Sequence, residues 1–261
     1  MKQTVLAILV FCFLFGQGVV RAQEYESDTT SLGILLTKEK AFHINMHTLG
    51  YGLGYRIGRN ISYYKNRMYE IDLIEMKAPN QVKTYNPRIP RSKSYIYGKL
   101  NYLYMLRAGY GKQHLVNRKP YWGGVEVRFF YYGGLTAAFE RPVYLYIAYY
   151  TSIGDIVYYD LKLERYDPER HFTYVSTDEN CDIAGGGPIL SGFDKIKIRP
   201  GAYTRLGFNF EFSKYNNLIR ALEIGVMVDV LPFGTEIMAF KDPSWFFING
   251  YFSFHFGKRY N

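Results

Sequence analysis

Apolar side chains recur at every second position through much of this chain, and this spacing restricts the fold more than any other feature. Val226, Val228 and Val230 fall on one side of an extended segment. Glu223 and Asp229 fall on the other side. A helix would repeat apolar residues every three or four positions, whereas the side chains of a pleated strand alternate between two faces. The sequence therefore predicts strands with one apolar and one polar face.

The same pattern in other segments indicates a membrane barrel. Between residues 202 and 212 the even positions are mostly apolar, and the odd positions include Arg205 and Glu211. Between residues 246 and 256, phenylalanines alternate with polar side chains. A soluble sandwich turns its polar faces outward, but here the strands are long, aromatic-rich and charged on the inner side. We therefore expect an all-β fold, a transmembrane antiparallel up-and-down β-barrel.

The composition supports this class of protein. The chain holds 27 tyrosines and 19 phenylalanines but only 2 tryptophans, and such an excess suits the aromatic girdles of outer-membrane barrels. Its net charge of +9 favours negatively charged partners, which for an exported barrel are outer-membrane lipid, lipopolysaccharide or an acidic protein. We do not expect nucleic acid as a partner.

The N-terminus has the order of a secretory signal. Lys2 precedes an apolar run over residues 5–15, and small residues lead to a cleavage site after Ala22. The alternative is an uncleaved helical anchor, but the run is shorter than the ~20 residues that span a bilayer. We therefore expect a signal peptide at residues 1–22 and a barrel domain at residues 23–261.

Eight segments have strand character, and we expect each to span the membrane. They are residues 29–36, 42–58, 67–76, 95–108, 122–135, 198–213, 221–231 and 245–257. The second changes its apolar parity between His47 and Gly50, which indicates a β-bulge. The long connection over residues 136–197 holds two more strand-like runs, at 143–150 and 155–165. We interpret them as an extracellular hairpin; if both spanned the membrane, the barrel would have ten strands.

The connections predict an orientation. Those at residues 59–66 and 214–220 are short, and those at residues 77–94 and 136–197 are long. Outer-membrane barrels keep short turns in the periplasm and long loops outside. The alternation is consistent if both termini are periplasmic, so we expect a multi-pass protein of the cell outer membrane.

The inner faces of these strands carry charges of both signs. By parity, the residues that face the lumen are Arg56, Glu70, Asp72, Lys99, Arg107, Glu126, Arg128, Arg205, Glu211, Glu223 and Asp229. Buried charges persist when they are paired, and an eight-stranded barrel is only wide enough for its side chains to fill. We therefore expect a closed, salt-bridged lumen; a selective pore or a proton path is the alternative.

Candidates for an active site are few. They are His43, His47, His171, and Ser253 with His255. Ser253 and His255 point inward by parity, away from a lipid substrate, and no acid adjacent in sequence orients a histidine for nucleophilic catalysis. We expect no enzyme activity and no catalytic residue.

Cofactor and metal motifs are equally weak. With Cys12 removed in the signal, Cys181 is the only cysteine, so an intrachain disulfide is excluded. The acidic run at 178–182 lacks the spacing of a calcium loop. Residues 185–188, Gly-Gly-Gly-Pro, lack the lysine and the strand–helix context of a phosphate cradle and are interpreted as a flexible stretch. We expect no cofactor and no metal.

The loop at residues 77–94 is basic, with no acidic residue and three prolines that stiffen it. Its cations are Lys77, Lys83, Arg88, Arg91 and Lys93. Lipopolysaccharide phosphates are natural counter-ions for such a display. The alternative is a loop that only improves solubility.

Several segments together resemble a little-characterised family of small outer-membrane barrels from Bacteroidota. They are residues 47–52, 97–101, 107–111, 119–128, 142–145 and 164–168. The resemblance implies a barrel in the outer membrane and implies no catalytic residues. We expect a structural or interaction role, such as a subunit of an outer-membrane assembly or secretion machine, with basic periplasmic ends for docking at Lys112, Arg118, Lys119, Lys258 and Arg259. The alternative is a lipid-modifying enzyme or a small channel.

Overall fold

A computed structural model describes residues 36–62, 64–79, 81–89, 92–119, 124–153, 156–169, 181–215 and 217–261. The expected signal peptide and nearly all of the expected first strand, residues 29–36, lie outside these ranges. So do Arg91 of the basic loop and His171. Within these ranges, helices that are both long and apolar enough to cross a membrane are not found.

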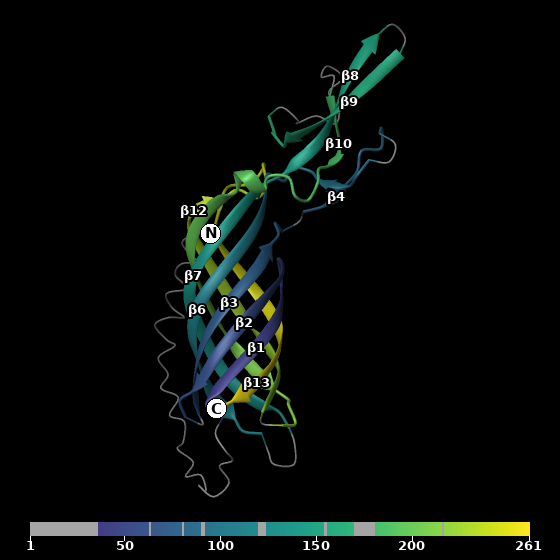
Figure 1. Cartoon of the computed structure of the whole chain (residues 1–261). Coiled ribbons are helices and arrows are strands. Elements are labelled where there is room, and N and C mark those ends of the chain that lie inside the picture. Colours follow the sequence, from purple (N-terminus) through teal and green to yellow (C-terminus); the bar gives the residue numbers. More distant parts are fainter. Residues whose placement is uncertain are drawn as a thin grey trace, which may run out of the picture. The chain divides into compact units, whose positions relative to one another are not determined.

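Eight antiparallel strands close into a barrel, as predicted (Figure 1). They are β1 (Lys38–His47), β2 (Gly50–Asn60), β3 (Lys65–Met76), β6 (Asn101–Asn117), β7 (Glu126–Pro142), β11 (Lys197–Glu211), β12 (Leu218–Thr235) and β13 (Ser244–Tyr260). Around the barrel they follow chain order, and β1 pairs with both β2 and β13. Every barrel strand thus has two neighbours, which satisfies its backbone polar groups without an open edge.

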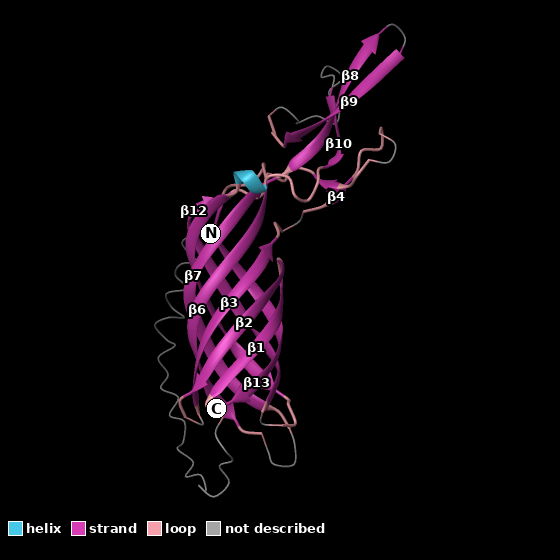
Figure 2. Ribbon diagram, viewed as in Figure 1, coloured by secondary structure: helices cyan, strands magenta, loops and turns pink. Residues whose placement is uncertain are grey.

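The remaining strands form two small sheets outside the barrel (Figure 2). β8 (Tyr144–Ile153) pairs with β9 (Ile156–Arg165) and with β10 (Cys181–Gly186). β4 (Lys83–Thr84) pairs with β5 (Tyr95–Ile96). The two extra runs of the long connection are therefore not spanning strands, and the ten-stranded alternative is wrong. The first half of the Gly-Gly-Gly-Pro run interpreted as flexible consists of strand residues, because Gly185 and Gly186 belong to β10.

The second predicted strand was wrong, although the total of eight was right. Residues 42–58 are two strands, β1 and β2, joined by a turn at Thr48 and Leu49. Across this hairpin Met46 lies opposite Tyr51. An even position therefore faces an odd one, and the outward parity must change at the turn. A β-bulge changes parity in the same way. The parity change between His47 and Gly50 was therefore wrongly attributed to a bulge, when its cause is this turn. Leu36, at the end of the expected first strand, lies outside any strand.

Two other strands have shifted bounds. The strand expected at residues 95–108 is divided, because Gly98 adopts a φ of 73° that a strand residue does not have. The spanning part, β6, begins at Asn101 and continues to Asn117. The strand expected at residues 122–135 is β7, which pairs with β6 as far as Pro142. Lys112 consequently lies within a strand and not in a periplasmic turn.

The alternation of faces holds along the barrel strands. Val226 is 44% exposed on the outer wall, whereas its neighbour Met227 is 1% exposed in the lumen. Phe252, Phe254 and Phe256 are likewise outward and exposed. An apolar outer wall around a polar interior is the arrangement of a strand barrel whose solvent on the outside is lipid.

Inward glycines make room for large lumen side chains. A Cβ at Gly109 would overlap the hydroxyl of Tyr203, and one at Gly111 would overlap the ring of Tyr132. The two tyrosines are buried, reaching from β11 and β7 across the interior. The barrel is therefore filled by its own side chains.

Candidate functional site

The centre of the lumen holds two arginines among three carboxylates. Arg56 on β2 donates to Glu223 at 2.9 Å and to Glu70 at 3.1 Å. Arg205 on β11 pairs with Glu70, with Asp72 at 3.3 Å, and with Glu223 at 3.7 Å. All five side chains are nearly or fully buried. Strands from different parts of the barrel are thereby joined through charge-assisted hydrogen bonds, which are stronger than neutral ones.

Tyrosines complete this central network. Tyr203 donates to Glu70 and Tyr251 donates to Glu223, each at 2.9 Å. The guanidinium of Arg205 lies 5.1 Å from the ring centre of Tyr132 and 5.2 Å from that of Tyr251. Such stacking adds attraction between buried groups. Sequence parity placed the charges but gave no reason to select these three tyrosines.

Arg107, His43 and His255 lie next to the central network. Arg107 donates to Asp229 at 2.5 Å. Asp72, which lies across from Arg107 in the β3–β6 register, instead contacts Arg205 and the Nε2 of His43 at 2.7 Å. Since a carboxylate only accepts, His43 carries its proton on Nε2 in this contact. The ring of His43 stacks on that of His255 at 4.6 Å.

The candidate catalytic residues lie inside this packed region. His43, Ser253 and His255 are each 0–1% exposed. Asp72 supplies the orienting acid that sequence proximity did not show. His47 is also buried. His43 and His47 make hydrogen bonds inside the barrel, with Asp72 and with the backbone N–H of Leu49, whereas Ser253 Oγ has no hydrogen-bond partner among the described residues. All four are buried, so a lipid outside the wall has no access to them.

Towards one end of the lumen, further predicted charges are paired. Arg128 lies 2.5 Å from Glu126, and Glu211 accepts from Arg259 at 2.5 and 2.7 Å. Arg259 also donates to Glu39 at 3.2 Å. Arg259 is therefore part of the barrel interior, so it is not the exposed docking residue that we expected.

Lys99 and the basic loop lie elsewhere. The ammonium of Lys99 donates to Gln81 at 3.0 Å and lies 4.1 Å from the ring centre of Tyr102. Lys77 lies over the ring of Tyr51. Arg88 approaches Asp182 at 3.7 Å. The structure therefore separates these cations from the central lumen network.

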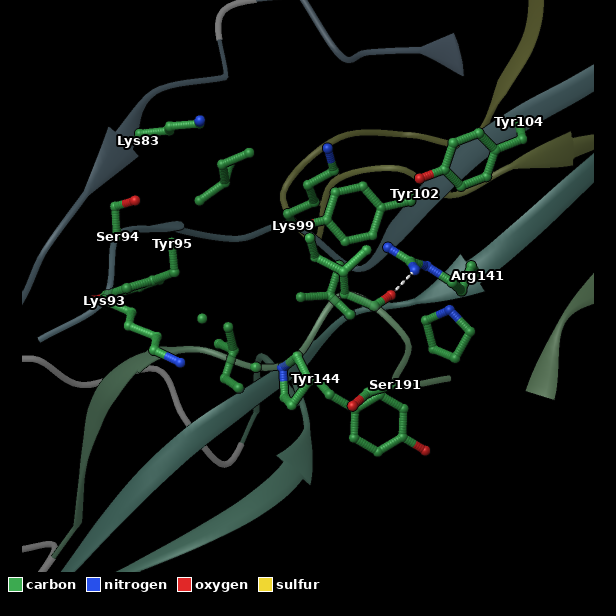
Figure 3. A pocket seen from close by; sticks show the side chains of 18 residues that line it. Lys83, Lys93, Ser94, Tyr95, Lys99, Tyr102, Tyr104, Arg141, Tyr144 and Ser191 are labelled. Atoms are coloured by element: carbon green, nitrogen blue, oxygen red, sulfur yellow. Dashed lines mark hydrogen bonds between the residues drawn. The ribbon is translucent and has the colours of Figure 1, made fainter. Parts of the chain in front are cut away.

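Lys83, Lys93 and Lys99 line a cavity of about 550 Å³ together with Arg141 (Figure 3). The cavity lies where β6 and β7 end and the small sheets begin, and Tyr102, Tyr104, Tyr144 and Gly186 contribute to its wall. Sequence reasoning selected Lys83 and Lys93 as an anion display but missed Arg141. The sequence signal that could have pointed to Arg141 was its position just before Pro142, at the end of a spanning strand.

Metal ligation finds no support in the described ranges, where no cluster of three or more His, Cys, Asp or Glu residues has suitable geometry. The acidic run at residues 178–182, which lacks the spacing of a calcium loop, is mostly outside those ranges. Its last residue, Asp182, accepts a hydrogen bond from Tyr150 at 3.2 Å.

The fold and lumen define an eight-stranded transmembrane barrel with a charge-filled interior. No protein-family model matches the chain, and no curated protein matches it. Among solved structures, the crystal structure of Neisserial surface protein A (NspA) matches with 10% sequence identity and a TM-score of 0.39. The match covers 86% of this chain and 96% of NspA. The strand pairing of this chain, and not the likeness, establishes the barrel.

Proposed function

We propose that the protein is an outer-membrane barrel that works by binding other envelope components at its surface, without conducting solutes and without catalysis. The observation that carries this proposal is the filled lumen, in which Arg56, Arg107 and Arg205 are each ion-paired and buried. A conducting path needs water-accessible space between such groups. Separating the buried pairs to open that space would strongly destabilise the folded protein. The barrel thus serves as an anchor.

The proposed orientation places both termini in the periplasm. Lys38 at the start of β1 pairs with Tyr260 at the end of β13, so both lie at one end of the barrel. The connections at residues 61–64, 118–125 and 212–217 are at this same end and are short. The connections that hold the small sheets are at the opposite end, which we assign to the cell exterior. Export through the expected signal peptide and membership of the Bacteroidota family remain predictions.

The sheet of β8, β9 and β10 supports an interaction role. β9 is an edge strand of this sheet, with β8 on its one paired side. Tyr158, Tyr159 and Leu161 on β9 are all exposed. An edge strand offers backbone donors and acceptors to an added strand, and apolar side chains supply contact area. We therefore propose that this sheet contacts a protein of an envelope complex, such as an assembly or secretion machine.

Affinity purification of the full chain from native outer membranes, followed by mass spectrometry, tests the proposal. The matched variant replaces residues 145–186 with a short glycine–serine turn, and heat-modifiable migration in gels checks that its barrel is intact. We expect stoichiometric partners with the wild type and their loss with the variant. Partners retained equally by both proteins would refute the role of the sheet. A lone barrel, with altered lipid A in a deletion strain, would favour a lipid-modifying enzyme.

A further inference from the structure

The cavity at the ends of β6 and β7 is lined by side chains from the outer face of the barrel wall. Leu103 and Met105 face the interior and belong to a buried apolar cluster. Because side chains alternate along a strand, Tyr102 and Tyr104 face outward. Arg141 lies opposite Tyr102 in the β6–β7 register and is on the same outer face. The cavity is therefore next to the surface that meets lipid, and it is separate from the lumen.

Four cations surround this space without a carboxylate among its lining residues. In Figure 3, Lys83 and Lys93 lie on one side of the cavity, with Lys99 and Arg141 on the other. None of the 18 described residues that line it is Asp or Glu. Several like charges held together are favourable only if an anion comes between them, and phosphate oxygens accept from lysine and arginine alike.

Two of the four cations are buried, Arg141 at the end of β7 and Lys99 just before β6. Lys99 is 2% and Arg141 is 4% exposed. Arg141 donates to the backbone carbonyl of Ile189 through Nη1, and its Nε is buried without a partner among the described residues. Burial, together with Lys77, Arg141 and Lys83, lowers the pKa of Lys99 to about 8, and Glu75 opposes the shift. An anion in the cavity would stabilise the charged form of Lys99.

An apolar surface continues from the cavity down the outer wall. Leu106 follows Tyr104 on the outward face of β6 and is exposed, and Leu135 on β7 is 74% exposed. Tyrosines at this level are typical of the interface between lipid headgroups and acyl chains. A ligand with a charged head and an apolar tail could contact both the cationic cavity and the apolar wall beside it. A soluble anion would contact only the cavity.

We propose that this cavity binds the phosphate group of an outer-leaflet lipid headgroup, with the acyl chains of the lipid lying against β6 and β7. The proposal rests on the membrane placement proposed above. Lys83 and Lys93 from the basic loop meet the phosphate from the exterior side, and Lys99 and Arg141 meet it from the wall. Tyr102 and Tyr104 contact the sugar or glycerol part of the headgroup.

The test uses the full-length barrel in phosphatidylcholine nanodiscs that contain either bisphosphorylated lipid A or the same lipid with both phosphates removed. Native mass spectrometry after release from the discs measures the lipid retained. The test variant is Lys83→Gln with Lys93→Gln, both exposed positions outside the barrel. The control is Lys162→Gln with Lys195→Gln, which removes the same charge from exposed positions away from the cavity.

We expect the wild type to retain phosphorylated lipid A preferentially. The test variant should bind it about tenfold more weakly, because charge-assisted contacts are lost, and the control should match the wild type. Equal retention of the phosphorylated and phosphate-free lipids would overturn the proposal, as would an equal loss in the control. Displacement of the lipid by inorganic phosphate at the same concentration would assign the cavity to a soluble anion and would also overturn it.

A separate measurement distinguishes a wrong lipid site from a wrong membrane orientation. In a Cys181→Ala background, which removes the native thiol of β10, Lys162→Cys on β9 should react with a membrane-impermeant maleimide on intact cells. If it does not react, the proposed orientation is wrong whatever the nanodisc result. If it reacts and the wild type shows no phosphate preference, the lipid site alone is refuted.

Discussion

The lumen and the outer cavity use the same residue types in opposite ways. In the lumen, Arg56 and Arg205 share Glu70 and Glu223 within hydrogen-bonding distance, so the protein supplies its own counter-ions. In the cavity, four cations approach a space of about 550 Å³ with no carboxylate among the described lining residues. The lumen arginines are thus paired within the protein, whereas the cavity cations are proposed to take their anion from outside.

This difference separates stability from binding within one barrel. A charge in the lumen is part of the folded structure, and its removal leaves a buried partner unpaired. A cation at the cavity entrance is exposed and can be removed at little cost to folding. The two regions should therefore respond differently to equivalent substitutions.

The largest effect should follow from removing a lumen carboxylate. Glu223→Gln leaves Arg56 without its closest ion pair and weakens the contact with Tyr251. We expect a loss of about 3–5 kcal/mol in the free energy of unfolding, as for other broken buried pairs. Urea unfolding in lipid vesicles measures this. Asp160→Asn, at an exposed position on β9, is the control and should change stability by less than about 0.5 kcal/mol. Equal effects would mean that the lumen pairs are not structural.

A smaller effect should come from charge on the lipid face. Val226→Arg places a guanidinium near the middle of β12, and we expect a loss of about 2–4 kcal/mol. Val230→Arg, on the same face but nearer the strand end, should cost less because the penalty falls towards the interface. Folding yield into bilayers and urea unfolding both report the difference. If the two variants fold equally well, the outer wall of β12 does not face a hydrocarbon core.

The closely packed interior gives a third prediction. Gly109→Ala would drive a methyl group against the hydroxyl of Tyr203, and overpacking typically costs about 1–3 kcal/mol. At the neighbouring outward position, Gly133→Ala would meet only the carbonyl of Tyr203, at 3.9 Å. The first variant should lower the midpoint of thermal unfolding and the second should not. An unchanged midpoint in Gly109→Ala would indicate a looser lumen than the structure describes.

The barrel could be predicted from the sequence because alternation is a local property that each strand repeats. Val226 and Asp229 were assigned to the correct faces from their neighbours alone. What the pattern could not show was the cause of a parity change, since a bulge and the turn at Thr48 and Leu49 give the same signal. It also could not show contacts between strands distant in sequence, because Arg56 on β2 meets Glu223 on β12 only after closure pairs β1 with β13.

The outer cavity was beyond sequence reasoning for a different reason. Its cations come from separate segments, and Arg141 follows Glu140 at a strand end where parity alone would not single it out. Lys83 and Lys93 were selected because their loop lacks acids, which is also true of many soluble loops. Only the three-dimensional arrangement brings them to the same space as Lys99.

A fourth prediction concerns Lys99 and pH. The pKa of Lys99 is lowered from 10.5 to about 8, mainly by burial. Between these values the unfolded chain binds a proton that the folded protein does not, so this group makes stability rise with pH from about 8 to about 10.5. In Lys99→Met that contribution should be absent. Unfolding curves of both proteins across this range measure the difference; parallel pH profiles would contradict the shift.

Conductance tests the central claim, a lumen closed by its own paired charges, most directly. The purified full-length protein is inserted into planar bilayers, and current is recorded under an applied voltage. The account predicts no steady conductance, because paired side chains of Arg56, Arg107 and Arg205 occupy the interior. Reproducible channels of fixed size in the wild type would contradict it.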